Sequence, residues 1–270
     1  MSAIQQIALP TDRVIARTEG AIGWITFNNP ARRNAMSQDM WEAIPLALDV
    51  MEANPAIRVI VLNGAGDRAF VAGADISEFN TLRSTPASVA HYDAISDEAN
   101  RRIATSPKPT IAMIQGFCIG GGVGLAVCCD MRIASEGAKF GVPATRLGLG
   151  YGHAGVKRLM DLVGPSHTKE IFYTARHFTA AEAKDMGLVN RVLPEADLAA
   201  YVATYCATIA DNAPMTMFAL KRTVEELLTL PEGANLPESD RLVAACFASQ
   251  DYIEGRTAFM EKRQPIFKGR

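Results

Sequence analysis

The alternation of strand and helix patterns, with glycine-rich turns behind the strands, constrains the fold more than any other feature of this chain. Residues 58–62 and 110–115 form apolar runs that predict buried strands. A polar stretch with helical spacing lies between them at 87–104, and the second strand leads into the cluster Gly120-Gly121-Gly122. A strand, a crossover helix and a second strand predict a βαβ sheet.

The two ends of the chain depart from this pattern. Residues 13–18 and 22–27 predict a hairpin, and Ser37 is a plausible N-cap for a helix that Asn54-Pro55 stops and Pro45 kinks or splits. From Pro165 onward the sequence predicts successive helices, at 180–186, 197–212, 214–230, 239–248 and 253–262, with a hinge at 231–237. We therefore expect an α/β core at residues 1–195 and a helical region at residues 196–270.

The charge and the cysteines exclude several classes of protein. The 270 residues include 27 Lys and Arg and 29 Asp and Glu, which gives a net charge of −2. The charge of the chain as a whole therefore does not favour binding to nucleic acid or to an anionic membrane surface. The first residues do not form a secretory leader, and no apolar stretch of about 20 residues follows. The five cysteines include no C-x-x-C pair and mostly have apolar neighbours, as reduced core thiols do. We expect a cytoplasmic protein.

One cofactor-binding motif is present in the sequence without the strands that a cofactor site needs. Residues 150–155 match G-x-G-x-x-G, but a dinucleotide site needs a buried strand before the motif and a second strand with an acidic end after its helix. Neither is expected here, because Gly164-Pro165 and another helix follow. The four histidines are scattered and no metal-ligand spacing occurs, so we expect neither a metal nor a permanently bound cofactor.

Two other glycine-rich segments, 69–76 and 116–126, each follow a strand and lie where a helix is expected to begin. Small side chains let a ligand approach the backbone, and the N–H groups at a helix start are donors without partners in the helix. Two such donors converging on one oxygen would form an oxyanion hole. The alternative is that these glycines serve only tight packing and turns, and the spacing alone leaves both interpretations open.

Six segments carry a shared pattern: the Asn-Pro-x-x-x-Asn-Ala motif in 28–36, then 69–79, 116–130, 140–143, 178–192 and 254–263. Together they resemble the enoyl-CoA hydratase/isomerase, or crotonase, superfamily over nearly the whole chain. The resemblance implies a ClpP/crotonase-like α/β fold of repeated ββα units, with a helical C-terminal region that mediates trimer formation. It also implies an acyl-CoA thioester substrate, with coenzyme A as part of that substrate, and a homotrimer or a homohexamer built as a dimer of trimers.

The resemblance further implies roles for single residues. In the family, two backbone N–H groups polarise the thioester carbonyl and stabilise its enolate, and the matching residues are Ala74 and Gly121. The segment around Ala74, which includes Ala72, Asp75 and Ile76, lines the adenine pocket in relatives. Arg32 matches a basic residue near the CoA phosphates. Phe259 and Lys262 match residues that close the CoA site, commonly from a neighbouring subunit. For Arg32 and Lys262 a solvated surface charge is the alternative.

The chain departs from the family pattern where hydratases carry two glutamates. Gly124 and Ala144 occupy those positions, and neither can move a proton, so hydration by two glutamates is not expected. The turn that follows brings Tyr151 and His153 toward the acyl end. Tyr151, in a pattern similar to methylmalonyl-CoA decarboxylase, is either a proton donor or a packing residue. The expected function is an enolate-stabilising acyl-CoA enzyme. The alternatives are a decarboxylating lyase and a catalytically silent thioester-binding subunit.

Overall fold

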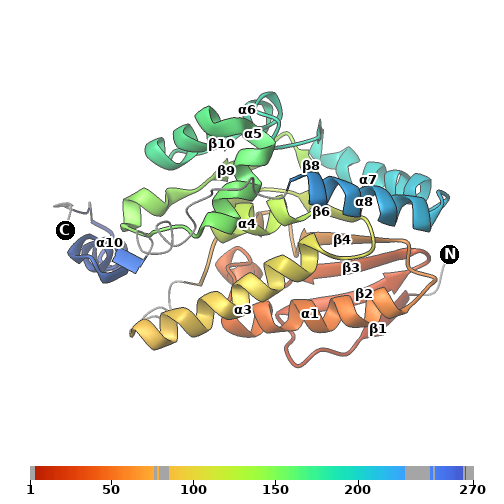
Figure 1. The fold of residues 1–270 in the computed structure, drawn as a ribbon, viewed down its shortest axis with the longest axis horizontal. Coiled ribbons are helices and arrows are strands. Elements are labelled where there is room, and N and C mark those ends of the chain that lie inside the picture. The colour runs from red at the N-terminus through yellow and green to blue at the C-terminus, as the bar shows by residue number, and fades with distance from the viewer. Residues whose placement is uncertain are drawn as a thin grey trace.

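The computed structural model describes residues 4–75, 78, 85–228, 244–245, 247–263 and 265, and it contains two β-sheets (Figure 1). The larger sheet has the strand order β1 (Ile4–Ile7), β2 (Val14–Glu19), β3 (Ile22–Phe27), β4 (Val59–Gly64), β6 (Thr110–Ile114), β8 (Met131–Ser135) and β11 (Arg191–Leu193). The smaller sheet has the order β10 (Phe178–Thr179), β9 (Lys139–Gly141), β7 (Phe117–Ile119) and β5 (Ala69–Val71). Neighbouring strands from β3 to β11 pair in parallel, which confirms the βαβ arrangement.

A repeated unit builds both sheets. After β4, β6 and β8 in the larger sheet the chain passes to β5, β7 and β9 in the smaller one, and these three also pair in parallel. The next described α-helix after each pair of strands is α3 (Pro86–Ala104), α4 (Gly121–Cys128) or α5 (His153–Thr174), respectively. The chain therefore has the mixed α/β fold of ββα units that the resemblance implied, and the dinucleotide-binding alternative is excluded.

The central strand β4 is buried on both faces. Val59 and Val61 belong to a small apolar cluster to which α7 (Glu195–Ala210) contributes Leu198, Val202 and Cys206. The alternate residues Ile60 and Leu62 belong to the main core, together with residues of α1 (Gln38–Ala53), α3 and α4. Successive side chains of a strand point to opposite faces, so two-sided burial explains the continuous apolar run in the sequence.

Most predicted elements are present within a few residues of the expected ends, including α6 (Ala180–Asp185). Of the two outcomes expected at Pro45, a kink or a split, the split is wrong, because α1 continues through this residue. A proline inside a helix costs about 3 kcal/mol, and the buried face of α1 outweighs that cost. The sequence pattern predicted no strand at β1, β5, β7, β8, β9, β10 or β11, each of which has five residues or fewer. The expected hinge at 231–237 and most of the helix at 239–248 lie outside the described residues.

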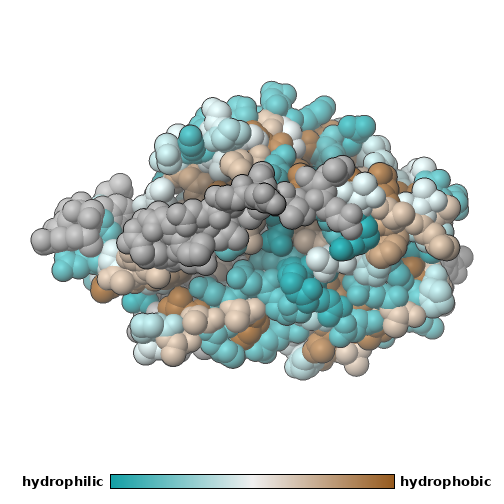
Figure 2. Space-filling view, viewed as in Figure 1, coloured by the Kyte–Doolittle hydropathy of each residue, from teal (hydrophilic) through white to brown (hydrophobic). Residues whose placement is uncertain are grey.

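The C-terminal helices use their apolar residues in different ways. The buried apolar residues of α7 pack against the larger sheet of the same chain. On α8 (Pro214–Leu227), by contrast, apolar side chains are exposed, and Figure 2 shows apolar surface where Figure 1 places this helix. The exposed residues are Met215, Phe218, Leu220 and Val224. In the part of the chain that the structure describes, no helix combines the length and apolar character of a membrane span.

Candidate functional site

The loop after β5 directs one backbone N–H group toward the start of α4. Met36 and Ala74 form an isolated parallel bridge, in which the Met36 N–H donates to the Gly73 carbonyl at 2.8 Å and the Asp75 N–H donates to the Met36 carbonyl at 2.7 Å. Successive peptide groups of an extended chain point to opposite sides. The N–H group of Ala74 therefore points away from Met36.

The start of α4 lies against this loop. Gly121 is the first residue of α4, and the first N–H groups of a helix have no partner within it. A Cβ atom built on Gly121 would stand 3.9 Å from the Ala74 nitrogen and 3.8 Å from the ring of Trp41. The structure thus brings together the two residues that the resemblance assigned to an oxyanion hole. Two converging donors at the positive end of a helix are suited to hold one oxyanion.

Packing explains most of the glycines nearby, but not Gly121. Gly73 has a φ of 106° and Gly120 a φ of 55°, a region that favours glycine. A Cβ atom on Gly122 would stand 2.2 Å from the Val71 carbonyl oxygen, so α4 could not pack against β5. The Cβ atom on Gly121 would make only ordinary van der Waals contacts. The packing interpretation therefore leaves the choice of glycine at 121 unexplained.

A buried asparagine holds the loop that carries Met36. Asn34 has a φ of 56°, and its side-chain amide donates to the carbonyls of Ala65 at 3.0 Å and Ala69 at 2.7 Å. Its side-chain oxygen accepts a hydrogen bond from the Asn29 N–H at 3.0 Å. These bonds fasten the loop to the turn before β5 and so position Met36 for its bridge. They give the second asparagine of the Asn-Pro-x-x-x-Asn-Ala motif a structural role.

Three of the residues expected at the CoA site lie together at one edge of this loop. Arg32 ends the 3-10 helix η1 (Pro30–Arg32), and its guanidinium pairs with the Asp75 carboxylate at 3.0 Å. Asp75 is buried, whereas the side chain of Arg32 is 55% exposed. Ala72 is half-buried and its N–H donates to the Arg33 carbonyl at 3.1 Å. Ile76 lies outside the described residues. Contact of this group with CoA stays a prediction.

The two positions that match the hydratase glutamates carry no side-chain function. Gly124 lies within the first turn of α4, and a Cβ atom built there has no neighbour within 4 Å. Ala144 is buried in the 3-10 helix η3 (Pro143–Leu147). A Cβ atom can therefore be added at position 124 without a clash.

Tyr151 and His153 lie at the start of α5. Tyr151 is half-buried and packs against the main core, with its ring edge-on to that of Phe172 and 5.0 Å between the centroids. His153 is half-buried and is the first residue of α5. His153 and Arg158 of α5 oppose the rise in the pKa of the Asp97 carboxyl on α3 that burial causes. The packing interpretation of Tyr151 thus has direct support, and a chemical role for either side chain stays a prediction.

The reasoning from sequence missed a polar face of α3 beside α4 and α5. The Cys128 Sγ atom lies 3.7 Å from the Asn100 Oδ1 atom and donates to the Gly124 carbonyl at 3.1 Å. Burial raises the pKa of Cys128 to about 11, so this thiol stays protonated at neutral pH. Burial also raises the pKa of the Asp97 carboxyl. The spacing of Asp97 and Asn100 along the predicted polar helix was the available signal.

The residues expected to close the CoA site lie on the surface of this chain. Phe259, on α10 (Gln250–Met260), is 52% exposed, and Lys262 just beyond it is also exposed. The helix packs on η3, where a Cβ atom on Gly255 would stand 2.3 Å from the Leu147 carbonyl oxygen. Closure of the CoA site of a neighbouring subunit by Phe259 and Lys262 stays a prediction.

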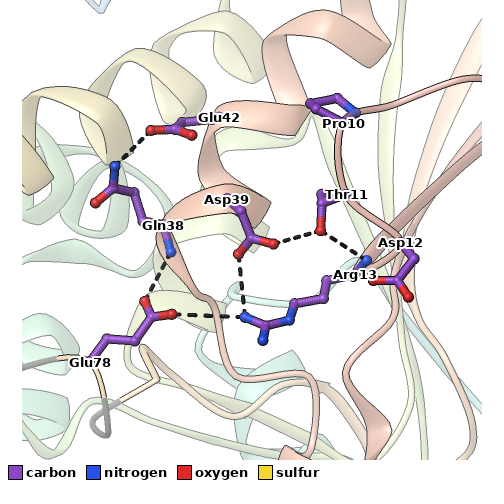
Figure 3. Close-up of a pocket in the computed structure, with 8 residues that line it drawn as sticks. All are labelled: Pro10, Thr11, Asp12, Arg13, Gln38, Asp39, Glu42 and Glu78. Carbon is purple, nitrogen blue, oxygen red and sulfur yellow. Dashed lines mark hydrogen bonds and ion pairs between the residues drawn. The ribbon is translucent and has the colours of Figure 1, made fainter.

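A polar pocket beside the start of α1 is the competing candidate (Figure 3). Its charged groups point toward one another: the Arg13 guanidinium lies 3.5 Å from Asp39 and 3.8 Å from Glu78, and Thr11 donates to Asp39 at 2.5 Å. Figure 3 also shows Pro10, Asp12, Gln38 and Glu42 in its lining. This pocket is a surface ion network, and Glu78 in its lining follows the first glycine-rich segment, with its N–H donating to the Asp75 carbonyl at 3.1 Å. Within the described ranges, no three His, Cys, Asp or Glu side chains are grouped to hold a metal ion.

Known proteins share both the sequence and the fold. A model of the enoyl-CoA hydratase/isomerase family matches residues 17–270. A crotonyl-CoA hydratase of Syntrophomonas wolfei is 36% identical over 257 residues, which cover 95% of this chain and 98% of that protein. An enoyl-CoA hydratase/carnithine racemase from Magnetospirillum magneticum has a TM-score of 0.80 at 35% identity, covering 98% and 97% of the two chains.

A methylmalonyl-CoA decarboxylase in complex with 2-nitronate-propionyl-CoA has a TM-score of 0.88 at 29% identity, covering 96% of this chain and 99% of that one. These similarities extend over nearly the whole chain and confirm the family that its motifs indicated. This chain belongs to the enoyl-CoA hydratase/isomerase family.

Proposed function

We propose that this chain is an enzyme that acts on a CoA thioester and stabilises its enolate through the N–H groups of Ala74 and Gly121. The observation that carries the proposal is the approach of these two residues at the start of α4, with a glycine at 121 that packing does not require. Family membership supports the substrate class, because relatives are named for crotonyl-CoA and methylmalonyl-CoA.

The proposed binding mode uses the groups around this pair. The thioester carbonyl oxygen accepts hydrogen bonds from both N–H groups, which are stronger for the enolate than for the neutral carbonyl. Arg32 faces the CoA phosphates from the exposed edge of the site, and the segment from Ala72 through Asp75 to Ile76 lines the adenine pocket. Phe259 and Lys262 close the site of a neighbouring subunit, so that residues 196–270 complete both the site and the oligomer.

Hydration by two glutamates does not fit the site. General acid–base catalysis requires a titratable atom within hydrogen-bond reach of the reacting group. At the two positions that match the hydratase glutamates, Gly124 and Ala144 supply none. The proposed chemistry is therefore enolate formation with a proton carried by another group.

Decarboxylation is a second candidate, supported by the TM-score of 0.88 with a methylmalonyl-CoA decarboxylase. In that reaction the bond between the α-carbon and the carboxylate breaks, CO₂ leaves, and the electron pair passes to the thioester oxygen held by the two N–H groups. One proton then returns to the α-carbon. Tyr151 is the proposed donor or orienter of that proton.

Tyr151→Phe tests this second candidate. The substitution removes the hydroxyl and keeps the ring that packs on Phe172. If the tyrosine handles the proton, the variant loses turnover of malonyl-CoA or methylmalonyl-CoA while its thermal unfolding stays close to that of the wild type. Equal turnover by both proteins assigns Tyr151 to packing alone.

A silent thioester-binding subunit is the remaining alternative, and turnover of any acyl-CoA by the purified protein contradicts it.

Assembly can be tested in the same preparation. The exposed apolar residues of α8 favour a trimer or hexamer that buries them. Light scattering at micromolar concentration should give the mass of three or six chains. A monomer would contradict both the assembly and the proposed exchange of Phe259 between subunits.

A further inference from the structure

Trp41 has no role in the proposed reaction, yet it lies against the candidate oxyanion hole. It is the fourth residue of α1. The ring atom Cζ2 of Trp41 lies 3.8 Å from the Cβ position of Gly121, and the Ala74 nitrogen lies 3.9 Å from the same point. Among the described residues, Trp41 supplies the side-chain atom nearest to this point. The indole and one of the two proposed donors therefore meet beside the other.

The gap between the indole and the Ala74 nitrogen is one atom wide. Nonbonded carbon atoms approach to about 3.5–4.0 Å, so a carbon at the Cβ position of Gly121 would touch both the ring and the nitrogen. An alanine at 121 would fill this gap with its methyl group, whereas glycine leaves it open. If the N–H groups of Ala74 and Gly121 hold a carbonyl oxygen, the atoms next to that carbonyl are the ones that can enter the gap.

A hydrogen bond holds the indole in place. The Trp41 Nε1 group donates to the Tyr92 hydroxyl of α3 at 2.8 Å, and both side chains are buried. The other tryptophan, Trp24, lies in the small apolar cluster that α7 helps to build, where its Nε1 group has no hydrogen-bond partner among the described residues. A buried N–H group without a partner costs free energy, so the bond to Tyr92 favours the observed orientation of Trp41. The ring can yield to a larger ligand only by breaking this bond.

The open side of the site lies further along α4. Gly124 follows Gly121 by three residues, so the two positions share a face of the helix and lie about 4.5 Å apart along its axis. A Cβ atom at Gly124 would meet nothing within 4 Å, whereas a Cβ atom at Gly121 would touch Trp41. An acyl chain therefore has room toward Gly124 but little room beside its carbonyl group.

We propose that Trp41 limits the bulk of the acyl group at its α-carbon, so that the protein selects CoA thioesters that are unbranched there. This inference rests on the proposed function, because it requires the thioester oxygen to lie between Ala74 and Gly121. The oxygen and the α-carbon are bonded to the same carbonyl carbon, so the α-substituents are the acyl atoms that come nearest to the indole. A methyl group on the α-carbon competes with the ring for the gap. If the reaction is a decarboxylation, malonyl-CoA is then preferred over methylmalonyl-CoA.

Fluorine NMR of the protein labelled with 5-fluorotryptophan tests whether the acyl group meets the ring. The chain has two tryptophans, so the spectrum should contain two signals, and the signal that Trp24→Phe removes belongs to Trp24. Saturation with butyryl-CoA should shift the Trp41 signal and leave the Trp24 signal in place. Coenzyme A without an acyl group should shift the Trp41 signal far less.

The two possible failures of this experiment are distinct. Binding of butyryl-CoA, measured by calorimetry, without a shift of the Trp41 signal overturns the inference and leaves the proposed function standing. Absence of binding contradicts the proposed function and the inference together. The measurement keeps Trp41 intact, so it also decides the matter if a variant at this buried position does not fold.

Butyryl-CoA and isobutyryl-CoA test the selectivity, because they have the same composition and differ in branching at the α-carbon. The wild type should bind butyryl-CoA about tenfold more tightly, the lower end of the effect of one carbon in an apolar pocket. Trp41→Leu should bring the two Kd values within about twofold, since the smaller side chain leaves room for the branch. Trp24→Leu is the matched control and should keep the wild-type ratio, because Trp24 lies in the other apolar cluster.

Three results of the selectivity experiment would overturn the inference. They are equal Kd values for the two thioesters in the wild type, a preference that survives Trp41→Leu, and a preference that is lost in Trp24→Leu as well.

Discussion

The candidate site has two halves that are built from different parts of the polypeptide. The backbone half is made of Gly73, Ala74, Gly120 and Gly121, whose peptide groups meet where two loops of the smaller sheet lie side by side. The side-chain half comprises the two positions that match the hydratase glutamates, Gly124 and Ala144. The backbone half depends on where the main chain runs, and the side-chain half depends on which side chains project from α4 and η3.

This difference explains why the fold determines the geometry of the backbone half but not the residues of the side-chain half. The backbone half is fixed by contacts of the main chain and of buried groups: the Met36 bridge, the amide of Asn34 and the close contact of Gly122 with Val71. The side-chain half can change one residue at a time without moving the main chain, since a Cβ atom at Gly124 would meet nothing. We infer that the backbone half sets the substrate class, while the side-chain half sets the reaction.

The largest effect is expected from rebuilding the side-chain half. Gly124→Glu with Ala144→Glu should raise the hydration of crotonyl-CoA by about 10²–10⁴-fold above a slow wild-type rate, because two carboxylates then position and activate water. The increase is measured from the loss of absorbance of the conjugated thioester. The corresponding pair of glutamines has the same shape without proton transfer and should give no increase.

Wild-type hydration as fast as that of a two-glutamate enzyme would contradict this description of the site. Another residue would then activate the water, and His153 at the start of α5 would be the first to test.

A slightly smaller effect on the rate is expected from placing a side chain at Gly121 in the backbone half. Gly121→Val places a branched side chain between the two donors and should lower kcat by about 10²–10³-fold, the cost of losing one oxyanion donor. Because the Cβ atom of residue 121 meets only ordinary contacts, the variant should fold and assemble like the wild type by circular dichroism and light scattering. Gly122→Val is the contrast: its Cβ atom would stand 2.2 Å from a backbone oxygen, so it should destabilise the fold itself. An unchanged kcat in Gly121→Val would remove Gly121 from the hole.

The smallest effect is expected at the exposed edge of the backbone half. Arg32→Ala should raise the Kd for an acyl-CoA about tenfold, or about 1.4 kcal/mol, the lower end of what a charge-assisted hydrogen bond contributes. The same acyl group on pantetheine, which lacks the nucleotide phosphates, should bind both proteins equally. Equal weakening with both thioesters would mean that Arg32 acts by holding Asp75 in place rather than by meeting the phosphates.

The sequence predicts the backbone half better than the side-chain half for a physical reason. Strand, helix and glycine patterns are local, and they correctly placed the βαβ units and the beginning of a helix within residues 116–126. Pairing of Ala74 with Gly121 followed from the resemblance, and the geometry agrees with it. The contact of Asn100 with Cys128 was not found, because it arises only when α3 packs on α4. The sequence left a kink and a split at Pro45 open for a similar reason, since the burial that keeps α1 unbroken is tertiary.

The central claim is that a thioester oxygen is held by two backbone N–H groups. A crystal structure of the protein with a slowly reacting acyl-CoA bound tests it most directly. The claim predicts that the thioester oxygen lies within about 3.1 Å of both the Ala74 and the Gly121 nitrogen atoms, with the acyl chain directed toward Gly124. A thioester oxygen bound elsewhere, or a CoA molecule that avoids the two glycine-rich turns, would contradict it.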